Sequence, residues 1–110
     1  MNELLIISTT DSFDLAREIA AELVSAHEAA CVNILQKIHS IYRWEGKLCT
    51  DEECLLLIKS SREKYEAVRA RIRSLHTYQV PEIIALPIVA GDPDYLSWLR
   101  LSLEQSGAAG

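Results

Sequence analysis

A long alternation of apolar and polar side chains runs through the middle of the chain, from Val32 to Trp44. Most even-numbered positions carry apolar or aromatic side chains, and the odd-numbered ones are polar apart from Leu35 and Ile41. Because strand side chains alternate between faces, this pattern predicts one strand of about 40 Å, at roughly 3.3 Å per residue. A compact domain of this length has a radius of gyration near ~13 Å. We therefore expect the strand to project beyond its own core, where another copy of the chain covers it.

Shorter patterns on both sides of this strand predict the remaining elements. Apolar residues at helical spacing follow Asp11 and Ser12, either of which can cap a helix. Ser60-x-x-Glu63 has the form of a capping box, and Asp92-Pro93 places a capping acid before a first-turn proline. In chain order we expect a strand at 3–9, a helix to about 27, strands at 30–44 and 47–59 joined by a turn at Glu45-Gly46, a helix after the capping box, a strand at 81–90 and a short helix ending near 105.

This order of elements predicts an α+β fold, a ferredoxin-like βαββαβ(α) sandwich with a long hairpin between its second and third strands. Both main helices then cover one face of the sheet. The stretch 54–58 is nevertheless apolar at both parities, so the opposite face is expected to be an oligomer interface. Pro87 cannot donate a ladder hydrogen bond and predicts an edge or a bulge. We expect a single domain over residues 1–105 and a flexible tail at 106–110.

The composition narrows the classes of function. The chain has 11 Lys and Arg against 16 Asp and Glu, a formal net charge of −5. Phosphate binding requires an excess of basic residues, so we expect no nucleic-acid partner. The first apolar run, Leu4 to Ile7, is too short for a membrane span or a signal peptide. We therefore expect no membrane partner and a cytoplasmic location.

No catalytic motif is apparent in the sequence. There is no G-x-S-x-G, H-E-x-x-H, Walker A or dinucleotide pattern, so we expect no enzymatic activity. We expect turn and capping roles for the hydroxyls at 8–10 and solvent exposure for the carboxylates at 51–53. Cys31, Cys49 and Cys54 are odd in number and lack C-x-x-C spacing, which favours free thiols over a disulfide framework or a zinc site.

Five stretches of the chain resemble the CutA divalent-cation tolerance proteins, a family related in architecture to the P-II signalling proteins. They are Ala29–Ile34, Ser40–Lys47, Glu53 with Leu56–Lys59, His76–Ile83 and Gly91–Trp98. Together they span about residues 4–103, and several motifs in the same order are far more specific than a lone pattern. The resemblance implies a ferredoxin-like fold, assembly as a tight homotrimer, and a role in the tolerance of copper and other divalent metals.

The resemblance also places a metal ligand at His76. Family members that bind copper have a second histidine beside it and a cysteine at the end of the first strand, where this chain has Leu75 and Ser8. A thiolate and two imidazoles suit copper, whereas one imidazole and one hydroxyl do not. We expect weak binding of copper or another divalent metal and no required cofactor. The alternative for His76 is a structural role at the negative end of a helix macrodipole. His27 and His39 lack ligand-like spacing, so packing or solvated roles are expected.

Aromatic and charged side chains of the motifs form a second candidate site: Tyr42, Trp44, Lys59, Tyr78 and Glu82. Such polar-tipped residues gather in clefts between subunits, so one hypothesis is an intersubunit pocket for a small molecule or ion. The alternative is that they join the trimer, with Lys59 and Glu82 as ion-pair partners.

Two functions are consistent with these observations. The first is a cytoplasmic homotrimer of the CutA type that binds divalent metal weakly and acts in metal tolerance. The second is a trimeric small-molecule sensor or protein-interaction scaffold related to the P-II signalling proteins.

Overall fold

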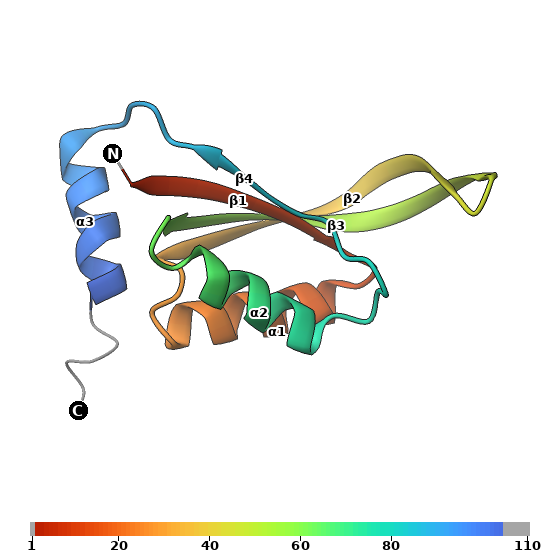
Figure 1. Cartoon of the computed structure of the whole chain (residues 1–110), viewed down its shortest axis with the longest axis horizontal. Helices are drawn as coiled ribbons and strands as arrows, with labels where there is room; N and C mark the ends of the chain where they lie inside the picture. The colour runs from red at the N-terminus through yellow and green to blue at the C-terminus, as the bar shows by residue number, and fades with distance from the viewer. Residues whose placement is uncertain (1, 105–110) are drawn as a thin grey trace.

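The computed structural model describes residues 2–104 and shows an α+β fold with one four-stranded antiparallel sheet (Figure 1). The strand order is β2-β3-β1-β4, as the ferredoxin-like prediction requires. The elements are β1 (Glu3–Thr10), α1 (Phe13–Ser25), β2 (Cys31–Trp44), β3 (Lys47–Ser61), α2 (Tyr65–Leu75), β4 (Ile83–Pro87) and α3 (Pro93–Leu103). The tail expected at 106–110 and the predicted domain limits at 1 and 105 lie outside the described residues.

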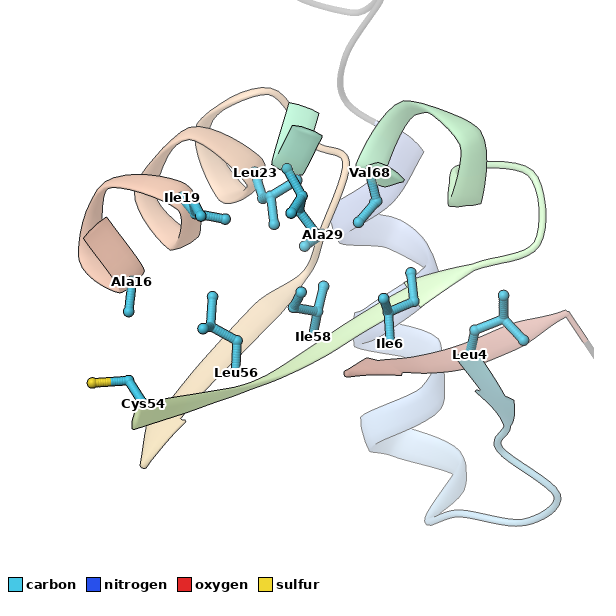
Figure 2. Packing of buried hydrophobic residues seen from close by; sticks show 11 residues of the cluster. Leu4, Ile6, Ala16, Ile19, Leu23, Ala29, Cys54, Leu56, Ile58 and Val68 are labelled. Atoms are coloured by element: carbon cyan, nitrogen blue, oxygen red, sulfur yellow. The ribbon is translucent and has the colours of Figure 1, made fainter. Parts of the chain in front are cut away.

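The hydrophobic core lies between one face of the sheet and helices α1 and α2. Leu4, Ile6, Leu56 and Ile58 point from the strands toward the helices, as Figure 2 shows for the labelled side chains. The helices contribute side chains at helical spacing that are fully buried: Ala16, Ile19, Leu23, Val68 and Ile72. Burying a Leu or Ile side chain contributes about 1.5–3 kcal/mol. The apolar stripes of the sequence thus account for this layer.

Both ends of α1 are satisfied by local hydrogen bonds. The Ser12 hydroxyl accepts from the backbone N–H of Leu15 at 3.1 Å, which confirms Ser12 as the N-cap. At the other end, Glu28 N–H donates to the Leu23 carbonyl at 2.9 Å and His27 N–H donates to the Val24 carbonyl at 3.1 Å. This is a Schellman motif, in which His27 takes the left-handed conformation with φ 58°.

The predicted capping box before α2 is wrong. Strand β3 continues to Ser61, and the hydroxyl of Ser60 donates to the Glu28 carbonyl at 2.6 Å. Helix α2 instead begins at Tyr65 with Lys64 as an N-cap that makes no side-chain capping bond. Tertiary pairing of β3 with β1 therefore overrides the local signal. The cap of α3 is as expected, because the Asp92 carboxylate accepts from two backbone N–H groups of the first turn.

The β2–β3 hairpin projects beyond the rest of the molecule (Figure 1). The protein measures 46 × 31 × 21 Å, with a radius of gyration of 14.7 Å against about 13 Å for a compact chain of this length. Glu45 and Gly46 form the turn at the tip with φ values of 51° and 80°. Positive φ at both central residues defines a type I′ turn, whose twist matches that of the two strands. The projecting strand predicted from the alternation is confirmed.

A β-bulge divides strand β2 into two halves. Leu35 pairs with Leu55 and Ile38 pairs with Glu53, so two residues of β2 lie opposite Cys54 alone. Lys37, within the bulge, has a left-handed φ of 63°. Because one extra residue shifts the side-chain parity, even-numbered positions before the bulge face the helices and those after it face the other way. The alternating pattern therefore belongs to one strand, but its apolar residues lie on the helix-covered face before the bulge and on the opposite face after it.

The sheet face opposite α1 and α2 is also apolar. Register places Leu5, Ile7, Leu55 and Leu57 there, beside Leu35, Ile84 and Leu86. Helix α3 covers only one end of this face, through Leu99 and Leu103 against Ala30. Leu35, Ile84 and Leu86 are left 45%, 51% and 45% exposed. Strand β4 lies at an edge of the sheet, as Pro87 predicted, but it spans only Ile83–Pro87 and is shorter than the strand expected at 81–90. In the described range, no helix combines the length and apolar character needed to cross a membrane.

Candidate functional site

A cavity of about 710 Å³ opens where the hairpin leaves the core. Three segments form it: the end of β1 at Thr9, the half of the hairpin beyond the bulge, and the connection between α2 and β4. Its described lining residues are Thr9, Ser40, Ile41, Tyr42, Trp44, Glu53, Thr77, Tyr78, Gln79, Val80 and Glu82. The bulge in β2 is what places Ser40, Tyr42 and Trp44 on the same sheet face as Glu53 and Thr9.

Glu53 is the most buried acid of the cavity. Glu53 is only 8% exposed, and its Oε2 accepts a hydrogen bond from the Tyr78 hydroxyl at 2.6 Å. Burial and this bond to Glu53 raise the pKa of Tyr78 above its usual value, burial being the larger cause. The expectation that the carboxylates at 51–53 face solvent holds for Asp51 and Glu52 and is wrong for Glu53. The segment after α2, distant in sequence, covers Glu53.

A second phenol–carboxylate pair lies further along the hairpin. The Tyr42 hydroxyl donates to Oδ2 of Asp51 across the two strands. This hydrogen bond is the main cause that raises the pKa of Tyr42 to about 12. Tyr42 and its neighbour Trp44 remain 41% and 45% exposed, so their rings are available for contact.

His76 is held by backbone groups on both ring nitrogens. Nδ1 lies 3.1 Å from the Tyr78 backbone nitrogen, and Nε2 lies 2.6 Å from the Thr9 carbonyl oxygen. An N–H can only donate and a carbonyl can only accept, so the ring is neutral with its proton on Nε2. The His76 ring also lies 4.6 Å from the Tyr78 ring, centroid to centroid. His76 therefore ties the end of β1 to the segment that follows α2.

The residues near His76 do not fit a tight metal centre. A metal at Nδ1 would displace the Tyr78 N–H, and a metal at Nε2 would displace the proton given to Thr9. Ser8, which stands where a thiolate would be needed, is fully buried in β1, and its hydroxyl has no hydrogen-bond partner there. Among residues 2–104 there is no group of three His, Cys, Asp or Glu side chains arranged to hold a metal ion. Metal ligation by His76 stays a prediction.

The remaining histidines and hydroxyls have other surroundings. His27 Nδ1 lies 3.0 Å from the Ser102 carbonyl oxygen, which links α1 to α3, and His39 is exposed on the hairpin opposite Glu52. Of the hydroxyls at 8–10, Thr10 alone has the expected turn role, because its Oγ1 donates to the Ser12 carbonyl at 2.7 Å. Ser8 and Thr9, earlier in the same strand, are buried.

Four of the five predicted cleft residues line the cavity together: Tyr42, Trp44, Tyr78 and Glu82. Lys59 does not, because it pairs with Cys31 near the opposite end of β3 and its Nζ donates to Oδ1 of Asn33. No ion pair joins Lys59 to Glu82 within the described part of one chain. A contact between these two residues in different copies stays a prediction.

Thr9 and Glu53 were missed as cavity residues. A glutamate immediately before an all-apolar run, 54–58, is the one sequence signal for a buried acid. The bulge that orients Tyr42 carries no such signal, because Lys37 occupies a position where a glycine would have indicated it.

Comparison with known proteins gives consistent matches along nearly the whole chain. The model of the CutA1 divalent ion tolerance protein family matches residues 4–102. The divalent-cation tolerance protein CutA of Thermus thermophilus is 47% identical over 100 residues, which are 91% of this chain and 96% of that protein. The chloroplastic protein CutA 1 of rice is 40% identical over 103 residues, and there the chain spans 94% of its own length but 58% of the relative's.

Solved structures agree with the fold. The Thermus thermophilus protein superposes with a TM-score of 0.89 at 45% identity, covering 91% of this chain and 97% of that one. CutA from Xylella fastidiosa superposes with a TM-score of 0.92 at 38% identity, covering 94% of this chain and 100% of that one. The matched residues include both strands of the hairpin and the segment around His76. The chain therefore belongs to the CutA1 divalent ion tolerance protein family.

Proposed function

We propose that this protein acts in divalent-metal tolerance as a homotrimer and without catalysing a reaction. The tolerance role is supported by family membership, since the relatives are named for tolerance of divalent cations and not for a reaction. The trimer is supported by the apolar sheet face that α3 leaves uncovered and by the hairpin that extends past the core. A monomer rarely exposes a contiguous apolar face of this kind.

The assembly can be tested with one charge placed on that face. Ile84→Glu puts a carboxylate among Leu5, Ile7 and Leu57, where three copies would bury it, and should yield a monomer in sedimentation equilibrium. Val24→Glu is the matched control, because Val24 is an exposed apolar residue on α1 at 42% exposure. A trimer that survives Ile84→Glu, or a wild-type protein that sediments as a monomer, contradicts the proposed assembly.

Copper or another divalent metal binds weakly in this proposal, and His76 is its ligand. Binding is weak because metal must compete with the two backbone partners of the ring. Calorimetric titration of the reduced protein with copper should give a weak site that His76→Ala removes and that His39→Ala retains, with melting curves to confirm folding. Equal binding by both variants would exclude His76.

The proposed compartment is the cytoplasm. All three cysteines are free thiols, which suits a reducing environment, although a related CutA structure from Archaeoglobus fulgidus is described as periplasmic. Cell fractionation tests the assignment: recovery of the protein in the periplasmic fraction would overturn it.

The cavity favours a second function, that of a ligand sensor. A space of about 710 Å³ with aromatic walls and two carboxylates has the size and composition of an organic ligand site. The assembly and the metal site above do not require such a space.

A further inference from the structure

The charged groups of the cavity all have one sign. Among the lining residues that the structure describes, Glu53 and Glu82 are acidic, and none is Lys, Arg or His. Asp51 does not line the cavity, but it accepts the hydrogen bond of the Tyr42 hydroxyl and so holds a third carboxylate next to the cavity wall. Glu82 is exposed and makes no ion pair with any described residue. The cavity therefore carries negative charge that no cation among residues 2–104 neutralises through an ion pair.

The two phenols of the cavity have already used their protons. Tyr78 donates its hydroxyl proton to Glu53, and Tyr42 donates its own to Asp51. A phenol carries one proton, so each oxygen can only accept a further hydrogen bond. The raised pKa values of both phenols mean that these protons stay in place at neutral pH. Carboxylates and phenol oxygens thus present acceptors to whatever enters.

Aromatic faces complete the cavity walls. Tyr42 and Trp44 follow one another at alternate positions of β2 and so lie on one face of the hairpin, and both are partly exposed. A cation within about 6 Å of an aromatic centroid gains roughly 0.5–2 kcal/mol, and Trp is the strongest partner. Aromatic rings beside carboxylates suit a cation that carries carbon.

We propose that this cavity binds an organic cation, an alkylammonium or guanidinium compound whose charge lies between Glu53 and Glu82 and whose carbon chain lies on Tyr42 and Trp44. An organic anion is disfavoured by the carboxylates. A bare metal ion lacks the necessary ligands, because no three suitable donors converge among residues 2–104. The inference deepens the sensor function and rests on it, with all named contacts coming from a single chain.

The test uses three probes with one carbon chain and different heads: hexylammonium, 1-hexanol and hexanoate. Isothermal titration calorimetry of the assembled protein should give saturable binding of hexylammonium at least about tenfold tighter than 1-hexanol, and no binding of hexanoate. Equal affinity for ammonium and alcohol, or no binding of hexylammonium, overturns the proposal.

Matched variants locate the charge. Glu82→Gln should weaken hexylammonium binding about tenfold without affecting 1-hexanol. Glu52→Gln makes the same change of net charge at an exposed neighbour of Glu53 on the other face of β3, and should leave both affinities unchanged. Trp44→Leu keeps an apolar wall and should weaken the ammonium selectively. Equal losses in Glu82→Gln and Glu52→Gln would show only a long-range charge effect and overturn the assignment.

Sedimentation of the same samples distinguishes failure of the organic-cation site from failure of the proposed trimer and of the sensor function. A trimer that binds none of the probes refutes the organic-cation site and leaves the assembly intact. Hexylammonium binding by a monomer refutes the assembly and leaves the site. Tight binding of hexanoate or 1-hexanol without hexylammonium retains a ligand sensor but excludes a cation as its ligand.

Discussion

Removal of the Tyr78 hydroxyl is the most direct perturbation of the cavity. Tyr78→Phe keeps the ring and its contact with His76, and deletes one hydrogen bond, the 2.6 Å contact with Oε2 of Glu53. A hydrogen bond to a charged group contributes about 1.5–3 kcal/mol. Because Glu53 is only 8% exposed, water replaces the lost donor poorly. We expect the free energy of unfolding to fall by about 2 kcal/mol per chain.

Urea denaturation followed by circular dichroism measures this loss, at one protein concentration because assembly makes stability concentration-dependent. Tyr42→Phe is the matched control: it deletes the same kind of bond, to Asp51, at a site with an exposed partner, and should change the midpoint far less. The double variant Tyr78→Phe with Glu53→Gln should cost less than the sum of the single changes. A loss in Tyr42→Phe equal to that in Tyr78→Phe, or no loss in Tyr78→Phe, would refute the argument from burial.

Four further predictions concern stability. Gly46→Ala should cost about 1 kcal/mol in thermal unfolding, because its φ of 80° strains any residue with a Cβ, although no atom lies within 4 Å of that Cβ. Glu45→Asn should stabilise the same turn by about 0.5 kcal/mol, since asparagine tolerates positive φ; a lower melting temperature would contradict the type I′ assignment. Leu56→Ala should cost about 3 kcal/mol in urea, as a fully buried leucine. The folded protein holds the Tyr78 proton more tightly than the unfolded chain, so its raised pKa contributes stability that is fully present below pH 10.0, the ordinary tyrosine value. This contribution is lost as the pH rises from 10.0 toward the pKa of the folded state. Above pH 10.0 the free energy of unfolding should therefore decline less steeply in Tyr78→Phe than in the wild-type protein.

Much of the fold follows from local patterns in the sequence. The apolar residues at helical spacing after Ser12, the turn at Glu45-Gly46 and the cap at Asp92 each predict one element from a local pattern, and each element is confirmed. Local signals failed where a distant strand competes for the same residues. Ser60 is the example, because pairing with β1 extends β3 through it and removes the cap.

Most residues of the candidate site could be selected from the sequence, but their arrangement in space could not. The aromatic and acidic residues at 42, 44, 78 and 82 could be selected as polar-tipped groups beside apolar strands, and they do line one cavity. Lys59 has the same character, yet its position along β3 puts it near Cys31. Glu53 is buried by the segment 77–82, some 25 residues later, which no local pattern contains. Positions along a strand and across a bulge are set by pairing, which composition does not encode.

The extra residue in β2 also constrains how the length of this chain can change. Two residues added to each hairpin strand beyond Lys37 would move the tip outward and keep Tyr42 and Trp44 on their present side, because strand side chains repeat every two residues. One residue deleted between Leu35 and Ile38 would turn the outer half of the hairpin inside out and separate Tyr42 from Glu53. The length of the hairpin can thus change by two residues per strand without loss of the cavity. A change of one residue in β2 would instead move Tyr42 and Trp44 to the other face and remove the cavity.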